Sequence, residues 1–337
     1  MSWKYFSMMP CRNQDEYFAL GSDIPKGNKE FIMSRSELMK FAKCPKKWLE
    51  GIPEKKTSAM QFGTLVDLFL TDPENAQSKV AVPPPIYSTT RMVCPSCGDE
   101  STTKSCRKCK QDRIETAVNF EWNWQSNHCR EWKEAQETSG KIVVDPKEME
   151  AVNASLEKFV ECQKGYLKRF CECSQHQMLI RANWHSSEGF VLPFKFLLDA
   201  APIPSSEFGN CIGDFKTTRD ASPRAWQKHV LDYQYHIQAA IYLDAINAGG
   251  RKYEHFVHLI GENVAPFMWT YRFLHPDWIE IGRNVYLEAL ERYCHCLTLE
   301  VDEWPEFDHD DCVPPQWLRS EHGLAGEIIS EPEYDLF

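Results

Sequence analysis

The spacing of apolar and polar positions changes character along the chain, from helix-like in the first half to strand-like in the second. In the first half, apolar residues recur at helical intervals and predict helices at 34–44, at 62–70 and within 147–171. In the second half, short apolar and aromatic runs predict strands at 178–184, 189–200, 210–218, 254–260 and 267–273. This order indicates an α/β fold in which helices flank a small mixed sheet.

Capping residues mark the ends of several helices. Ser34 precedes the first helix with Glu37 three positions later, as in a capping box, and Pro45 follows its end. Ser222-Pro223 opens a long helix whose apolar spacing continues to Gly249-Gly250. A last helix is expected from about 276 to 297.

Four segments follow from these patterns. Residues 1–30 are expected to form a loose lead-in, and residues 31–299 the folded α/β domain. Residues 91–113 are rich in cysteine and are expected to be an insertion between helices. Residues 300–337 form an acidic tail, interpreted as a solvated end or, alternatively, as an interaction tail that mimics DNA.

Charge and cysteine content narrow the class of protein. The formal net charge is -11 over 337 residues, which argues against coating of nucleic acid by bulk attraction but allows a local basic channel. We see no secretion-signal pattern at the start and no apolar run of membrane-spanning length, so no membrane association is expected. The 14 cysteines then favour metal ligands and buried thiols in a reducing, cytoplasmic setting.

The clearest chemical pattern lies on two consecutive strands. In Gly213-Asp214-Phe215-Lys216, strand alternation places Asp214 and Lys216 on the same face. The preceding strand ends at Asp199, which lies beside Asp214 if the two strands pair as a hairpin. Two adjacent carboxylates favour a cation between them, and hard oxygen ligands suit Mg²⁺. A lysine at that ion can orient a water or stabilise phosphate charge, so the set suffices for phosphodiester hydrolysis.

Placement distinguishes this tripeptide from an ordinary surface ion pair. An Asp-x-Lys sequence alone is usually solvent-exposed, but here it lies within an apolar strand and directly before a well-capped helix. On that helix, Gln238 and Tyr242 are four positions apart and share one face. A tyrosine alone is often a core residue, and a glutamine alone is often a polar residue without a role. The pair after this strand indicates a shared site.

Together these motifs resemble those of RecB-like PD-(D/E)XK nucleases. The residues Gly213 to Lys216 and Gln238 to Tyr242 resemble the GDxK and QxxxY motifs of that family. The segment from Ser36 to Pro45 resembles its N-terminal helix signature, and Gly63 to Asp67 occupies the place of its GxxxH motif. The stretch through Ala221-Ser222-Pro223 is closer to RecE-type exonucleases of phages and prophages. Each motif is weak alone, but four in the right order are specific.

The resemblance excludes the cysteine-rich insertion and implies a restriction-endonuclease-like core with a set of roles. By it, Asp199 and Asp214 hold the metal, Lys216 is the catalytic lysine, and Gln238 and Tyr242 position the DNA end and the lysine. It implies Mg²⁺-dependent (or Mn²⁺-dependent) 5′ to 3′ degradation of one strand of linear duplex DNA in phage-type recombination within a bacterial cell. It also implies a homo-oligomer and a single-strand annealing recombinase as partner.

Two other functions stay open at this stage. One is a RecB-like nuclease of a defence or repair system that acts on other DNA structures. The other is a non-catalytic, zinc-bearing protein that binds DNA or serves as a scaffold.

One position departs from the family pattern. Asp67 stands where the family has histidine. Aspartate is a competent ligand for a hard metal ion, so altered coordination is the favoured interpretation. An Asp67 on the helix surface without a role is the alternative.

Four cysteines form the strongest single motif in the sequence. Cys94 and Cys97, then Cys106 and Cys109, make two Cys-x-x-Cys knuckles whose spacing suits a structural Zn²⁺. Unrelated free thiols are a poor alternative, because the segment has too few apolar residues to fold without metal. A weaker metal site is conceivable at Cys162, Cys171, Cys173 and His176, where free thiols at a helix end are the favoured alternative. The family resemblance also implies an iron–sulfur site of Cys44 with Cys294, Cys296 and Cys312, but their spacing does not match the compact pattern of such sites.

Basic residues offer two candidate DNA contacts. Between 91 and 113 there are six basic and three acidic residues, and Arg107 and Lys108 can contact a phosphate backbone. An oligomer contact or a solvated loop fits that segment equally well. Lys46 and Lys47 belong to a second basic run, for which a solvated helix face is the alternative.

Overall fold

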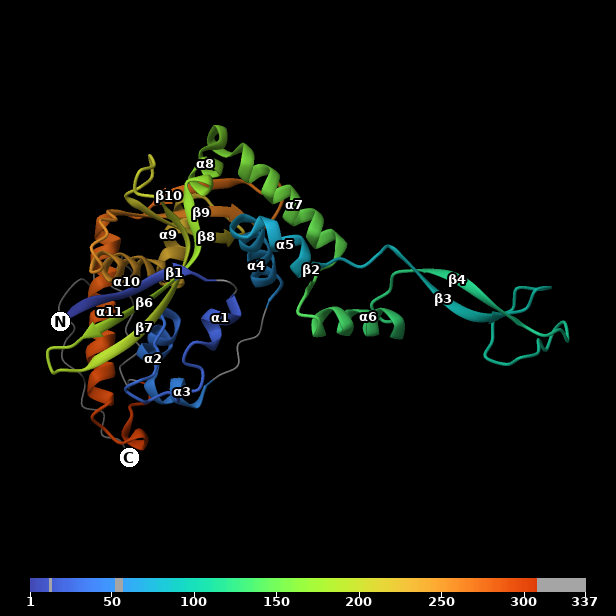
Figure 1. The fold of residues 1–337 in the computed structure, drawn as a ribbon, viewed down its shortest axis with the longest axis horizontal. Helices are drawn as coiled ribbons and strands as arrows, with labels where there is room; N and C mark the ends of the chain where they lie inside the picture. The colour runs from blue at the N-terminus through green and yellow to red at the C-terminus, as the bar shows by residue number, and fades with distance from the viewer. Residues whose placement is uncertain (12–13, 52–56, 308–337) are drawn as a thin grey trace, which may run out of the picture.

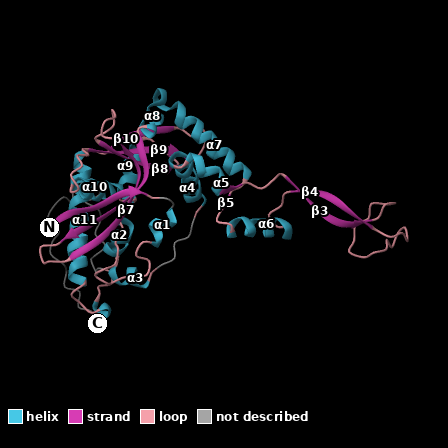
Figure 2. Ribbon diagram, viewed as in Figure 1, coloured by secondary structure: helices cyan, strands magenta, loops and turns pink. Residues whose placement is uncertain are grey.

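A mixed six-stranded sheet runs through the computed structural model, which describes residues 1–11, 14–51 and 57–307 (Figures 1 and 2). Neighbours in the order β1-β6-β7-β8-β9-β10 are antiparallel, except β8 and β9, which are parallel. The strands are β1 (Ser2–Pro10), β6 (Ser174–His185), β7 (Val191–Pro202), β8 (Cys211–Thr218), β9 (His255–Glu262) and β10 (Trp269–Phe273). The expected α/β class with a small mixed sheet is therefore confirmed.

Helices cover both faces of this sheet. The helices α2 (Arg35–Lys43), α9 (Pro223–Asp232), α10 (Tyr235–Asn247) and α11 (Pro276–Cys296) pack on one face. The helices α4 (Ser58–Thr71), α7 (Pro146–Glu161) and α8 (Tyr166–Glu172) pack on the other. Strand β9 shows the alternation, since Phe256 and Ile260 join the first cluster while Val257 and Leu259 join the second. No described helix is both long and apolar enough to cross a bilayer.

The first helix begins where its cap predicts. Ser34 accepts a hydrogen bond from the backbone N–H of Glu37, which fixes the start of α2. The Glu37 side chain does not complete a capping box, because it accepts hydrogen bonds from Trp48 and pairs with Lys26 instead. Trp48 lies on α3 (Pro45–Glu50), so this carboxylate joins two successive helices.

The long helix expected from Ser222 is two helices. Helix α9 ends at Asp232 and α10 starts at Tyr235, with Gln234 between them in the left-handed region at φ 56°. The guanidinium of Arg35 donates to the carbonyls of both Tyr233 and Gln234 at the break, at 2.5 and 2.6 Å. Apolar spacing continues on both sides, so the sequence pattern does not reveal a break that this distant arginine stabilises.

The expectation of a loose lead-in is wrong for the first ten residues. They form β1, an edge strand that pairs antiparallel with β6, with Trp3 opposite Trp184. Edge strands are held by backbone hydrogen bonds along one side and need little apolar periodicity. Trp3 also packs edge-on against Phe194, with ring centroids 5.0 Å apart. The short helix α1 (Gln14–Ala19) follows.

The cysteine-rich insertion is longer than the sequence pattern indicates. Strands β3 (Ile86–Val93) and β4 (Ile114–Glu121) form a hairpin arm that projects away from the body, and the cysteines lie at its tip (Figure 1). The arm leaves the body after α5 (Pro73–Lys79) and returns through α6 (Asn127–Thr138). At its root, β2 (Val80–Ala81) pairs in parallel with β5 (Ile142–Val143). Both arm strands are largely solvent-exposed and polar, so they lack the apolar pattern by which strands are predicted from sequence.

The first residues of the predicted acidic tail contact the body. A short 3-10 helix at Val301–Glu303 leads to Trp304, which is buried and stacks on Trp48 with centroids 6.2 Å apart. The remainder of that predicted tail, from residue 308, lies outside the described residues.

Candidate active site

Two strands bring the predicted carboxylates together. Ala200 on β7 lies opposite Gly213 on β8, and the antiparallel register therefore places Asp199 next to Asp214. One oxygen of the Asp199 carboxylate accepts a 3.0 Å hydrogen bond from the backbone N–H of Phe215. The geometric expectation of a hairpin neighbour is confirmed, while the metal-binding role of these residues stays a prediction.

Asp214 lies at the centre of a buried polar group. Its side chain is only 4% exposed, and its Oδ1 accepts a 2.7 Å hydrogen bond from Nε2 of Gln238 on α10. Its Oδ2 faces the ammonium of Lys216, with which it forms an ion pair. The same ammonium donates to the backbone carbonyl of Phe215 at 3.2 Å. Asp214 and Lys216 thus share one face of β8, as strand alternation predicts.

Helix α4 adds a third carboxylate from the opposite side of the sheet. Gly63 packs this helix closely on β8, because a Cβ at that position would lie 2.9 Å from Oγ1 of Thr217. One turn later, Oδ2 of Asp67 accepts a 3.2 Å hydrogen bond from Gln177, while Oδ1 is buried without a hydrogen-bond partner among the described residues. Asp67 therefore points into a cleft and contacts Gln177, while its role as a metal ligand stays a prediction.

The three carboxylates disfavour one another's charge. Burial raises the pKa of Asp67 to about 7; the ammonium of Lys216 opposes this rise, and the Asp214 carboxylate adds to it. Burial, then Asp214 and Asp67, hold the pKa of Asp199 well above its usual range. Burial lowers the pKa of Lys216, but Asp214 and Asp199 outweigh it and leave the pKa raised, so this lysine is an ammonium.

These carboxylates are the donor type that a hard divalent cation takes, although their oxygens do not all lie within 4.8 Å of one another as the sulfur atoms of the arm cysteines do. Oδ1 of Asp67 is buried without a hydrogen-bond partner among the described residues, whereas Oδ2 of Asp214 faces the Lys216 ammonium. A cation bound by Asp67, Asp199 and Asp214 would relieve the repulsion that raises the pKa values of Asp67 and Asp199. Carboxylate oxygens are the ligands that Mg²⁺ and Mn²⁺ prefer.

A cleft of about 690 Å³ opens onto Asp67 and Lys216. It lies between α4 and the segment that joins α9 to α10. Its polar and aromatic lining includes Thr218, Arg219, His229, Tyr233, Tyr235 and Asn263. Through this cleft, the Asp67 carboxylate and the Lys216 ammonium can be reached from solvent.

Tyr242 lies behind the site rather than in the cleft. Its ring is buried and packs against Phe196 and Phe256, with centroids 5.2 and 6.4 Å away. Burial raises its pKa well above the usual range, and Asp214 and Asp199 add to this effect. Of the predicted helical pair, Gln238 is therefore the residue that hydrogen-bonds a carboxylate of the site.

Three residues near the site carry no recognisable sequence signal. Arg35 fastens the α9–α10 break beside the cleft, and Gln177, with φ 49°, holds Asp67. His258 lies opposite Asp214 in the β8–β9 register and is fully buried, with no partner for either ring nitrogen among the described residues. Burial lowers its pKa to about 4, so the imidazole is neutral. Only the strand register, which is not visible in the sequence, identifies His258.

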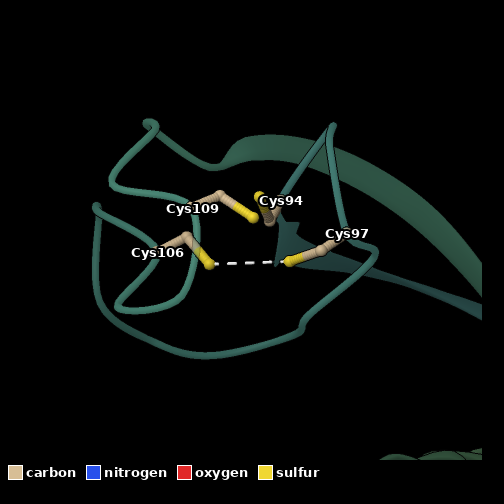
Figure 3. Close-up of side chains that lie close together, drawn as sticks. All are labelled: Cys94, Cys97, Cys106 and Cys109. Carbon is tan, nitrogen blue, oxygen red and sulfur yellow. Dashed lines mark hydrogen bonds between the residues drawn. The ribbon is translucent and has the colours of Figure 1, made fainter.

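The four cysteines of the arm meet at its tip (Figure 3). Their sulfur atoms lie within 4.8 Å of one another, which suits tetrahedral Zn²⁺ coordination. The two knuckles repeat one geometry: Gly98 donates to the carbonyl of Cys94, and Lys110 donates to that of Cys106. Both Gly98 and Lys110 have positive φ, at 69° and 56°. A backbone N–H of Cys109 lowers the pKa of Cys106 to about 7, which favours a thiolate.

Two basic residues at the tip of the arm form ion pairs or hydrogen bonds within the tip. Arg113 is buried and donates to Asp99 at 2.6 Å and to the carbonyls of Thr103 and Ser105. Lys108, predicted to contact DNA, pairs with the same Asp99 at 3.0 Å. Arg107 is exposed and has no ion pair in the described part of the chain.

The second basic candidate also has internal partners. Lys46 pairs with Glu306 at 2.7 Å, and Lys47 lies 5.5 Å from the centre of the Phe307 ring. Both lysines are therefore engaged with the segment that follows α11. Whether they contact DNA stays a prediction.

The two weaker metal sites find no support among the described residues. The ring nitrogens of His176 lie 2.9 and 3.0 Å from the backbone carbonyls of Asp199 and Cys171, and Cys162 donates to the carbonyl of Trp269. In the described ranges, the arm cysteines are the group of three or more candidate ligands that lie together. Cys312 of the iron–sulfur hypothesis lies outside these ranges.

Two comparisons with known proteins agree with this geometry. Residues 192–309 match the model of a family described as a PDDEXK-like domain of unknown function (DUF3799), and this stretch contains Asp199, Asp214, Lys216 and Gln238. The fold is similar to the crystal structure of a putative exonuclease from Eubacterium rectale, at 12% identity and a TM-score of 0.52. That likeness covers 93% of this chain and 98% of the other. No curated protein matches the sequence.

The molecule therefore has a PD-(D/E)XK-like nuclease fold, as the motifs predict. The family match covers residues 192–309, and the solved structure, at 12% identity, shows a likeness of fold alone. The narrower resemblance to RecE-type exonucleases stays a prediction.

Proposed function

We propose that the protein is a divalent-metal-dependent deoxyribonuclease that degrades one strand of linear duplex DNA from an end, in the 5′ to 3′ direction. The observation that carries this proposal is that Asp67 and Lys216 line one cleft, while Asp214 pairs with Lys216 and Asp199 lies next to Asp214 in the strand register. Phosphodiester hydrolysis needs a cation site, a fixed positive charge and room for an extended anion, and all three coincide here.

The side chains of the site have separable roles in this proposal. Asp67, Asp199 and Asp214 would hold Mg²⁺ or Mn²⁺, which when bound supplies charge neutralisation and polarises the phosphate. Lys216, fixed by Asp214 and by the Phe215 carbonyl, presents its ammonium to a phosphate oxygen or to the attacking water. Gln238 holds Oδ1 of Asp214, and the other oxygen, Oδ2, faces the Lys216 ammonium, beside which the cation would bind.

The test is digestion of end-labelled linear duplex DNA with Mg²⁺ or Mn²⁺, by the wild type and by Lys216→Ala. Lys4→Ala on the edge strand β1 is the matched control, because Lys4 is exposed and remote from the cleft. We expect progressive loss of one strand with the wild type and the control, and a drop of at least about 100-fold with Lys216→Ala, as for lost electrostatic stabilisation elsewhere.

Two further outcomes separate the competing functions. Equal cleavage of circular and linear duplexes would replace the exonuclease proposal by a nuclease that acts internally. No cleavage by zinc-loaded wild type with either metal would reject the nuclease proposal and favour a DNA-binding or scaffold role.

A further inference from the structure

Three aromatic rings form a ladder from the core to the mouth of the cleft. The rings of Trp226 and Tyr235 stack with centroids 5.5 Å apart, and those of Tyr235 and Tyr233 stack at 5.6 Å, each pair 26° from parallel. Trp226 is 3% exposed, whereas Tyr233 is 58% exposed and lines the cleft. The ammonium of Lys216 lies 5.2 Å from the centre of the Tyr235 ring. The ladder therefore connects the catalytic lysine to an open aromatic face.

The break between α9 and α10 makes this stack possible. In a continuous helix, residues two positions apart point to different faces and their rings cannot stack. The left-handed conformation of Gln234 brings Tyr233 and Tyr235 onto one side. Because Arg35 binds the carbonyls of Tyr233 and Gln234, the backbone that carries the open ring is held in place.

The surroundings of the open ring suit a nucleotide. Arg219 is exposed at the same cleft and has no ion pair in the described ranges, and Asn263 adds a neutral polar group. An aromatic face beside free cationic and polar groups offers stacking for a base and charge for its phosphate. If Tyr233 served only to end α9, its ring would not need to stack on the ring of Tyr235.

We propose that Tyr233 stacks on the unpaired base next to the phosphate that Lys216 contacts, while Arg219 contacts an adjacent phosphate. This inference rests on the proposed nuclease function and adds a substrate form to it. The base must leave the duplex to reach the ring, so the enzyme acts on a frayed or single-stranded terminal nucleotide. Stacking accepts any base, so no sequence preference is expected at this position.

The test uses a duplex with the fluorescent base 2-aminopurine at its 5′-terminal nucleotide, bound in Ca²⁺ to slow cleavage. The variants are Tyr233→Leu, which removes the ring, and Tyr233→Phe, which keeps it. Phe273→Leu is the matched control, since Phe273 is an exposed aromatic residue on β10 that does not line this cleft. We expect quenching of the fluorescence by the wild type, Tyr233→Phe and Phe273→Leu, and its loss in Tyr233→Leu.

Affinity provides the second readout. Tyr233→Leu should weaken binding of the frayed end roughly 5- to 150-fold, the range for one base stack. An abasic terminal nucleotide should abolish this difference, because no base remains to stack. If Tyr233→Leu retains both quenching and affinity while the wild type still cleaves DNA, the stacking proposal is overturned and the nuclease proposal stands. If the wild type fails to cleave any DNA, the nuclease proposal falls independently of these readouts.

Discussion

The side-chain amide of Gln238 donates a 2.7 Å hydrogen bond to Oδ1 of Asp214, within the buried contact between α10 and β8. This bond sets which carboxylate oxygen faces Lys216, because only Oδ2 remains on the side of the ammonium. The amide N–H donates here without adding charge, because the side chain of Gln238 is neutral, and the site already holds three carboxylates. The residue thus orients a proposed metal ligand without adding to the repulsion.

Replacing Gln238 by leucine should impair the site more than the fold. The change leaves Oδ1 of Asp214 buried without a donor, at a cost of about 1–3 kcal/mol. We expect cleavage to fall by about 10- to 100-fold, as when a residue that hydrogen-bonds a metal ligand is lost. The measurement is cleavage rate against Mg²⁺ concentration, with urea denaturation in parallel. An unchanged Mg²⁺ dependence would show that Gln238 does not orient a metal ligand.

The raised pKa of Asp67 predicts a pH-dependent stability in the absence of metal. A carboxyl group whose pKa rises on folding binds its proton more tightly in the folded state. The free energy of unfolding therefore falls as pH rises from about 4, the ordinary value, to about 7, the folded value. In chelator, Asp67→Asn should melt several degrees above the wild type at pH 8, with little difference at pH 4. A gain of equal size at both pH values would contradict the assignment.

Zinc removal should disorder the tip of the arm and leave the sheet intact. The tip has few apolar residues, so without a shared metal ion the four cysteines leave little to hold it folded. We expect the wild type to contain about one zinc ion per chain and Cys97→Ser to contain none. The variant should also be cleaved by proteases between residues 94 and 113. The melting temperature of the body should change by less than about 2 °C. The half-buried Cys173, changed to Ser, is the control, and loss of zinc in that variant would refute the tip as the site.

Arg35→Ala should loosen the helix break. The two carbonyls of Tyr233 and Gln234 lose their charged donor, at about 1–3 kcal/mol in stability. Arg35→Lys should recover part of that loss, since an ammonium also donates but lacks the planar fork. Hydrogen exchange at residues 233–236 measures the effect, with the exposed Arg224→Ala on α9 as control. Unchanged exchange in Arg35→Ala would show that the break holds without it.

Charge changes can locate the DNA path. Arg219→Ala should weaken duplex binding and reduce the slope of log affinity against log salt by about one, as expected for one lost phosphate contact. Lys46→Ala should change this slope little, because Lys46 already pairs with Glu306. A larger effect at Lys46 than at Arg219 would move the DNA path from the cleft to α3.

Local rules account for the part of the site that lies within single strands and helices. Alternation along β8 places Asp214 with Lys216, and helical spacing places Gln238 on their side. Rules of this kind do not describe contacts between distant segments. The bond from Gln177 to Asp67 and the position of His258 opposite Asp214 depend on the sheet register and on a left-handed residue, neither of which alters apolar spacing.

In the fold, too, the elements that bury a periodic apolar face could be predicted from the sequence, and the others could not. Predicted strands and most predicted helices are present, because each buries a periodic apolar face. The edge strand β1 and the arm strands β3 and β4 escape the pattern, since they are exposed on one or both sides. The apolar pattern does not reveal the α9–α10 break either, because Arg35 binds backbone carbonyls there and the spacing of apolar side chains continues unchanged.

The parallel pairing of Val80 with Ile142 brings the start and the end of the arm side by side. The arm therefore enters and leaves the body at one place, outside the central sheet. Because the two root strands run in the same direction, a linker that replaced the arm would have to cross back over the root to join Ala81 to Ile142. The length of the arm and its cysteine tip can thus vary at this root while Asp199, Asp214 and Lys216 keep their positions in the sheet.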